Sequence, residues 1–140
     1  MNELSFKLKL ATRSLNSFHE IFSEPYSTII RDATLFRFKR SVEIFWSFLK
    51  DYLCVHEGFV CESPKSCMRM AFKVRLMDEE ETVKALEMID IRLKSEQAYH
   101  EEVAEEIYRR IRGYWDLMDR VCRRVAEKLE LDFSSRPAEK

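Results

Sequence analysis

Residues that interrupt a helix are rare in this chain. Its 140 residues include two glycines and three prolines: Gly58, Gly113, Pro25, Pro64 and Pro137. A β-rich fold needs frequent turns, and glycine and proline supply many of them. The long stretches between these positions therefore favour helices, and the length suits one domain with its own core.

Apolar residues recur at steps of three and four along these stretches, which places them on one face of a helix. We predict helices over residues 4–22, 27–55, 64–74 and 78–93, and a last and longest helix whose apolar stripe covers residues 103–129. Serine before proline at Ser63 and an acidic start at Asp78 mark two of the helix beginnings. The sequence thus predicts an all-α fold, an antiparallel up-and-down four-helix bundle with one extra short helix. Residues 1–133 form this single domain, and residues 134–140 are expected to be a flexible polar tail.

The predicted core combines residues from the first, second and last helices: Leu15, Phe18, Phe38, Val42, Trp46, Leu49, Ile107, Ile111, Met118 and Val121. Aromatic residues dominate the second helix, where they suit either a core or a binding groove, and we favour the core. The fourth helix is expected to bury Val83, Leu86, Ile89 and Leu93.

Charge is nearly balanced over the chain, with 24 Lys and Arg against 25 Asp and Glu. Basic residues cluster within residues 31–40 and 109–124. Such clusters are typical of a solvated helix face balanced by glutamates. Alternatively, they would form an RNA- or nucleotide-facing surface if several arginines share one side of the protein. The first residues contain no uninterrupted apolar run, so we predict no signal peptide, no membrane span and a cytoplasmic location.

The four cysteines form no C-x-x-C pair. In a cytosolic chain we expect Cys54, Cys61, Cys67 and Cys122 to be reduced and mostly buried. Three of them lie close to His56, which leaves a zinc loop as an alternative. Their spacings match no usual structural zinc pattern, so we predict no metal and no cofactor.

Three segments, taken in order, resemble one known family. Residues 30–53 bear an arginine, a glutamate and a tryptophan on the second helix. Residues 63–72 carry a Ser-Pro-basic motif ahead of an Ala-Phe pair, and residues 99–108 begin the last helix. These segments resemble the nucleotidyltransferase substrate-binding proteins of the HEPN superfamily. The resemblance implies a homodimer, partnered with a minimal nucleotidyltransferase encoded nearby, as in toxin–antitoxin pairs.

The resemblance also implies a site within residues 90–102. In active members an arginine and a histidine with four residues between them face their copies across the dimer and cleave RNA without metal. In some members a tyrosine two residues after the histidine receives AMP. Position by position, the arginine is Arg92, the histidine position holds Gln97, and the tyrosine is Tyr99. Leu93 stands where an asparagine usually follows the arginine.

Gln97 removes the proton exchange that this cleavage requires. Histidine takes and gives protons near neutral pH, whereas a glutamine amide does neither. The loss of positioned acid–base chemistry typically costs about two to four orders of magnitude in rate. Arg92 still suits a phosphate, which a guanidinium binds through paired hydrogen bonds. The sequence therefore favours a degenerate ribonuclease motif and a binding role for nucleotide or RNA.

Alternatives stay open at this stretch. His100 would lie on roughly the same face as Gln97 if residues 90–102 are helical, and would then replace the missing histidine in an active ribonuclease. The plainer interpretation is a surface residue. Tyr99 is either an AMP acceptor, because its hydroxyl can attack an activated phosphate, or a partly buried residue at a helix start. A structural bundle without this function is the third hypothesis. The sequence identifies neither the nucleotide nor any RNA target, nor whether the pair is a toxin–antitoxin system.

Overall fold

The computed structural model describes residues 3–131 and 133, and all regular structure in this part of the chain is helical. The helices are α1 (Glu3–Glu20), α2 (Thr28–Glu57), α3 (Pro64–Lys73), α4 (Glu79–Lys94), α5 (Glu101–Arg110) and α6 (Arg112–Leu129). Short 3-10 turns, Ile21–Ser23 and Ser95–Gln97, follow α1 and α4. The predicted all-α bundle is confirmed. The predicted tail, residues 134–140, lies outside the described residues.

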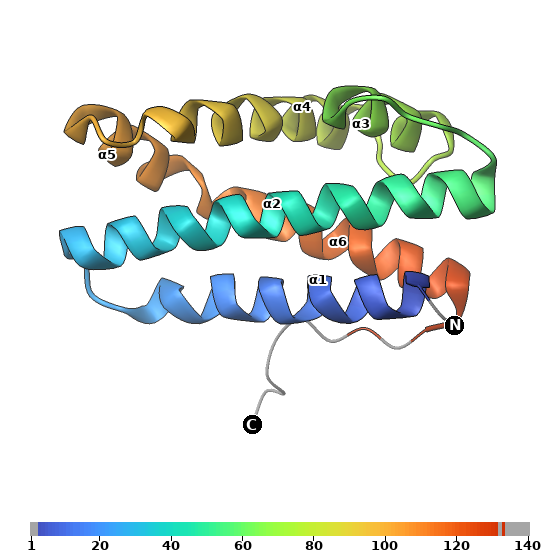
Figure 1. The fold of residues 1–140 in the computed structure, drawn as a ribbon, viewed down its shortest axis with the longest axis horizontal. Helices are drawn as coiled ribbons and strands as arrows, with labels where there is room; N and C mark the ends of the chain where they lie inside the picture. Colours follow the sequence, from blue (N-terminus) through green and yellow to red (C-terminus); the bar gives the residue numbers. More distant parts are fainter. Residues whose placement is uncertain (1–2, 132, 134–140) are drawn as a thin grey trace.

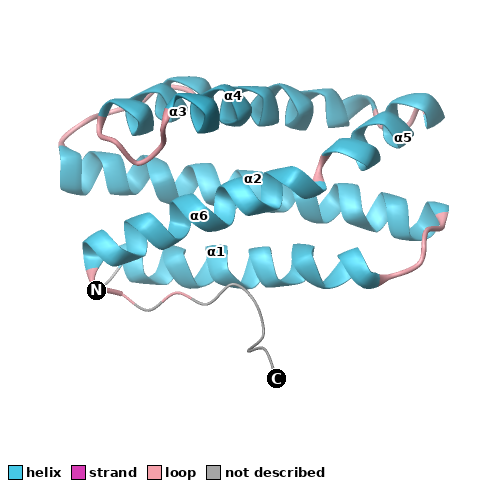
Figure 2. Ribbon diagram, turned by 180° about the vertical axis from the view of Figure 1, so that it is seen from behind, coloured by secondary structure: helices cyan, strands magenta, loops and turns pink. Residues whose placement is uncertain are grey.

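The long helices lie side by side and alternate in direction (Figure 1). α1 is antiparallel to α2, and α4 runs back along α2 in the opposite direction. α3 covers the C-terminal half of α2, while α5 lies at the other end of the bundle. Seen from behind, α6 crosses the space between α1 and α4 (Figure 2). α2 contacts each of the other five helices.

The predicted helix starts are confirmed by their capping hydrogen bonds. The hydroxyl of Ser27 accepts the N–H of Ile30 at 3.0 Å and caps α2. Ser63 and Asp78 each form a capping box, at α3 and α4. α2 ends at Gly58, whose φ of 77° lies in the left-handed region that favours glycine. These boundaries depend on neighbouring residues alone, which is why the sequence predicts them.

The last helix is neither continuous nor the longest, so this prediction is wrong. The chain breaks between α5 and α6 at Ile111, where the N–H of Tyr114 donates to the Ile111 carbonyl at 3.1 Å. α2, with 30 residues, is the longest helix. Ile107, Ile111 and Tyr114 are all buried, so the apolar stripe continues through the break. The break allows α5 to pack on α2 while α6 packs on α1 and α4.

The buried residues agree with the prediction for the first, second and last predicted helices, and differ from it in α4. Nine of the ten predicted core residues are buried, and Trp46 is partly exposed. Val83 and Leu93, which we expected in the core, are 64% and 56% exposed. α4 instead buries Ala85 and Met88. Apolar residues occupy two faces of this helix, and only the packing of α2 and α6 selects between them.

The cysteines also differ from the expectation. Cys61 and Cys67 form a disulfide that closes the connection from α2 to the first turn of α3. Cys54 is exposed, and Cys122 is a buried thiol whose pKa is raised by burial. The expectation of reduced thiols is therefore wrong for Cys61 and Cys67, whereas the expectation of mostly buried cysteines is confirmed, since only Cys54 is exposed.

Two phenylalanines on α2 provide a matched test of this packing. Phe48 is fully buried and Phe36 is 63% exposed. We expect Phe48→Ala to lower the free energy of unfolding by about 3–5 kcal/mol, because it leaves a cavity. Phe36→Ala should change it by less than about 0.5 kcal/mol. Urea denaturation measures both; equal losses would contradict this placement of α2.

Candidate functional site

Arg92, near the end of α4, lies against α2. Its Nη2 pairs with Glu43 of α2, and its Nη1 lies 3.1 Å from a carboxylate oxygen of Glu96. Lys39 of α2 contacts the same Glu96 carboxylate at 3.0 Å, and this hydrogen bond holds the pKa of Glu96 below its ordinary value. Two cations and two carboxylates therefore form a neutral cluster. The Arg92 Nε is buried and has no hydrogen-bond partner among the described residues.

Gln97, Tyr99 and His100 do not lie on a helix. α4 ends at Lys94, Gln97 closes a 3-10 turn, and the His100 N–H donates to the Gln97 carbonyl at 3.1 Å. Residues 90–102 are not one continuous helix, so the condition under which Gln97 and His100 would share a helix face is not met. All three side chains are exposed. Tyr99 is 80% exposed, which excludes the partly buried alternative, and its ring centroid lies 4.5 Å from that of His100.

Ion pairs between α2, α4 and α5 hold this turn in place. Arg31 of α2 is buried, and its Nη1 donates to Glu101 and, at 3.0 Å, to Glu105. These hydrogen bonds raise the pKa of Arg31. Lys94 donates to Glu106 at 2.9 Å and joins the end of α4 to α5. The first turns of α5 are thus fixed on α2, and residues 95–100 bridge a short gap between two anchored helices.

A groove of about 550 Å³ opens beside Arg92. It is lined from three helices and the residue before α3: Val42, Glu43 and Trp46; Ser63, Pro64 and Lys65; Ile89, Arg92 and Leu93. Two segments that carry the family resemblance thus meet the arginine of the motif at one place. Lys65 pairs with Asp90 at 2.7 Å on this side of the bundle. The Lys50 ammonium lies 5.3 Å from the centroid of the Trp46 ring.

Sequence reasoning found Arg92 but missed its partners. Glu96 follows Arg92 by four residues, a spacing at which opposite charges often pair on a helix. This contact could therefore have been predicted from the sequence. Glu43 and Trp46 are three residues apart and therefore share one side of α2. No local pattern links Glu43 to Arg92, because that ion pair depends on how α2 and α4 cross.

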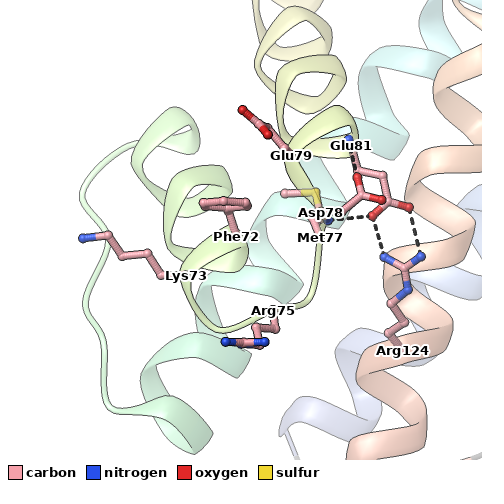
Figure 3. Close-up of a pocket in the computed structure, with 8 residues that line it drawn as sticks. All are labelled: Phe72, Lys73, Arg75, Met77, Asp78, Glu79, Glu81 and Arg124. Carbon is pink, nitrogen blue, oxygen red and sulfur yellow. Dashed lines mark hydrogen bonds and ion pairs between the residues drawn. The ribbon is translucent and has the colours of Figure 1, made fainter.

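A second cavity, of about 590 Å³, lies between the α3–α4 turn and α6 (Figure 3). Its polar wall is an ion pair in which Arg124 donates to both oxygens of Glu81, at 2.7 and 2.9 Å. Arg124 also donates to the Leu76 carbonyl at 2.7 Å. The hydrogen bonds from Arg124 lower the pKa of Glu81. These groups are mutually satisfied and tie the start of α4 to α6.

Most arginines of the second basic cluster have acidic partners. Arg110 pairs with Glu87 at 2.8 Å, and the Nε of Arg123 with Asp119 at 3.2 Å. With Arg124 already paired to Glu81, these contacts agree with a helix surface balanced by carboxylates. They give no support to a free basic surface.

The described part of the chain contains neither a metal-binding cluster nor a membrane-spanning helix. Within residues 3–131 and 133, no group of three or more His, Cys, Asp and Glu side chains is placed to hold a metal ion. In the same part of the chain, no helix combines the length and apolar content required to cross a bilayer.

Comparison with known proteins covers nearly the whole bundle. Residues 6–127 match a family described as "Nucleotidyltransferase substrate binding protein like". A crystal structure of a protein from Thermus thermophilus is similar, with 34% sequence identity and a TM-score of 0.73. The similarity covers 88% of this chain and 98% of that chain. No curated protein matches the chain. The matched residues include the groove and the whole of residues 90–102.

The Glu81–Arg124 pair predicts a pH dependence of stability. A carboxylate whose pKa is lowered in the folded protein stabilises it above the ordinary glutamate pKa of about 4.3. That contribution is lost as the pH falls through the folded-state pKa. The Glu81→Gln variant keeps a side chain that can cap α4 but removes the charge. Its free energy of unfolding should therefore fall less steeply than that of the unaltered protein as the pH drops below about 5.

Urea unfolding between pH 7 and pH 3 measures this difference. The control is Glu80→Gln, which removes an exposed carboxylate one residue away. Superimposable pH profiles for the unaltered protein and Glu81→Gln would show that the pair does not contribute.

Proposed function

The chain belongs to the nucleotidyltransferase substrate-binding family, and we propose that it is a HEPN-type member that binds rather than cleaves. It acts as a cytoplasmic homodimer, docks a minimal nucleotidyltransferase encoded nearby as in toxin–antitoxin modules, and carries a degenerate ribonuclease motif. The observation that carries this proposal is the setting of Arg92. Glu43 and Glu96 neutralise it, and the position five residues later holds Gln97 in place of histidine.

Cleavage needs both charge stabilisation and proton transfer. Arg92 has the chemistry for the first, since a guanidinium can bind a phosphate through two hydrogen bonds. The second needs a group that exchanges protons near neutral pH, and Gln97 cannot do so. Binding therefore survives the substitution at position 97, while catalysis does not.

Exposed apolar side chains along α4 and on the turn after it support the proposed dimer. Val83 and Leu93 of α4 and Tyr99 of the following turn are 64%, 56% and 80% exposed. Single exposed apolar residues are normal, but a series along one helix and its end suits an interface. Tyr99 also remains the proposed AMP acceptor. Its hydroxyl oxygen would attack the α-phosphate of ATP and release pyrophosphate, with the proton passing to a base of the partner enzyme.

An active ribonuclease that uses Arg92 with His100 is the second candidate. The observation that favours it is local: the hydrogen bond between the His100 N–H and the Gln97 carbonyl keeps the histidine beside the degenerate position. Against it, His100 lies just before α5 and shares no helix face with Gln97, which ends the preceding 3-10 turn. The two candidates differ in what the isolated protein does to RNA.

Coexpression with the neighbouring nucleotidyltransferase tests the main proposal. We expect the two proteins to copurify as one complex, and the isolated chain to be a dimer at micromolar concentration in analytical ultracentrifugation. Leu93→Asp should produce monomers, because it places a charge within the proposed interface. A monomeric unaltered protein that captures no nucleotidyltransferase would refute this function.

The matched control is Val55→Asp. Val55 is 67% exposed and lies in the last turns of α2, at the end of the bundle away from α5 (Figure 1). This variant should stay dimeric. If both variants dissociate, general destabilisation explains the result and the assignment of the interface fails.

Cleavage of single-stranded RNA without metal separates the two candidates. We expect little cleavage by the unaltered protein and no change in His100→Ala. Gln97→His should raise the rate about a hundredfold or more, because it restores a proton-exchanging group. Brisk cleavage that His100→Ala abolishes would instead identify His100 as the working base.

A further inference from the structure

We propose that the groove beside Arg92 binds a nucleoside monophosphate, with its base against Trp46 and its phosphate on Arg92. This inference rests on the proposed binding function and adds to it a location and a ligand class. It concerns the groove within one chain, between α2, α4 and the start of α3.

The groove has the size and lining of a small-molecule site. Its volume of about 550 Å³ falls within the range of about 300–1,000 Å³ that is usual for such sites. Pro64, Ile89 and Leu93 give it apolar walls, and Trp46 adds an indole. Indole rings stack with nucleobases of any sequence, because every base has a π face. These walls therefore suit a flat aromatic ring better than a fully charged ligand.

The polar side of the groove suits a phosphate. Arg92 is 19% exposed on its side chain, and its buried Nε lacks a partner among the described residues. A phosphate can accept from the terminal nitrogens of this guanidinium once Glu43 has moved away. Lys65 lines the same groove, where its ammonium is paired with Asp90 at 2.7 Å. A base and a phosphate thus each have a chemically matched wall.

Binding requires an exchange of partners at Arg92. The phosphate has to displace Glu43, whose side chain is 48% exposed and can therefore return to water. The exchange replaces a carboxylate by a phosphate dianion and keeps the guanidinium paired throughout. Glu43 consequently competes with the ligand, and its charge should weaken binding. Glu96 remains paired with Lys39.

The second cavity is lined by an exposed phenylalanine, Phe72, by three cations and by three carboxylates. Arg124 already donates to both oxygens of Glu81 (Figure 3) and to the Leu76 carbonyl. Glu79 and Asp78 add negative charge to its lining. Arg124 therefore has no uncommitted donor for an anion, and the three carboxylates balance the charges of Arg124, Lys73 and Arg75.

Titration of the full chain with AMP tests the proposal by tryptophan fluorescence. The chain has two tryptophans, and Trp115 is buried with its Nε1–H bonded to the Leu15 carbonyl. A Trp115→Phe background leaves Trp46 as the reporter, and we expect saturable quenching by AMP. Two partial ligands should each bind at least about tenfold more weakly than AMP, because each makes only one of the two contacts. Adenosine lacks the phosphate that would bind Arg92, and inorganic phosphate lacks the base that would stack on Trp46.

Three variants in this background assign the contacts. Arg92→Ala should weaken AMP binding at least about tenfold. Glu43→Gln should strengthen it about two- to fivefold, which is the effect of removing a partly exposed ion pair. Arg110→Ala removes another ion-paired arginine outside the groove and should change nothing. A binding constant that is insensitive to Arg92→Ala, or an absence of quenching at millimolar AMP, overturns the proposal. So does RNA binding that depends on Arg92 in a protein that does not bind AMP.

These outcomes are separable from those of the proposed function. If the nucleotidyltransferase copurifies but AMP does not bind, the groove assignment fails and the docking function stands. If AMP binds with the expected variant pattern but no complex forms, the groove assignment stands alone. Melting temperatures of all variants, compared with that of the parent protein, exclude misfolding as the cause of lost binding.

Discussion

The packing of α2 against every other helix is the constraint on which this structure depends. Its buried residues form much of the core, and Phe38, Phe48 and Leu49 are fully enclosed. Side chains on the other faces of α2 hold the candidate site in place. Arg31 anchors α5 near one end, while Glu43 and Trp46 stand beside α4 at its middle. A rigid helix that serves as core and as site wall allows little variation in either.

Charge neutralisation at Arg92 connects that scaffold to function. An arginine paired to two carboxylates is held in position and ready for an anion, but it attracts anions weakly from a distance. Selectivity then has to come from contacts made after arrival, such as stacking on Trp46. A surface of this kind favours a small ligand or a docked protein over long RNA, whose binding draws on many unpaired cations at once.

The sequence predicted what local chemistry decides. Caps at Ser27, Ser63 and Asp78 set helix starts because each cap involves residues within one turn. Prediction from the sequence was wrong where packing against distant residues decides which of two equally apolar faces is buried. α4 carries two apolar faces, and packing buries Ala85 in preference to Val83. The burial of Arg31 and the turn within residues 95–100 likewise follow from contacts between helices, and no periodicity encodes them.

The turn within residues 95–100 separates the two ends of the motif, Arg92 and position 97. Within one chain, Arg92 points to α2 whereas Gln97 lies exposed on a 3-10 turn, and no hydrogen bond between their side chains occurs among the described residues. A histidine introduced at position 97 would therefore stand on the same exposed turn, outside the helix that carries Arg92. In the proposed dimer a second surface covers this turn and can bring a substrate phosphate into contact with both groups. Restoring the histidine would then restore cleavage only in the assembled protein, which makes assembly a condition of catalysis in this architecture.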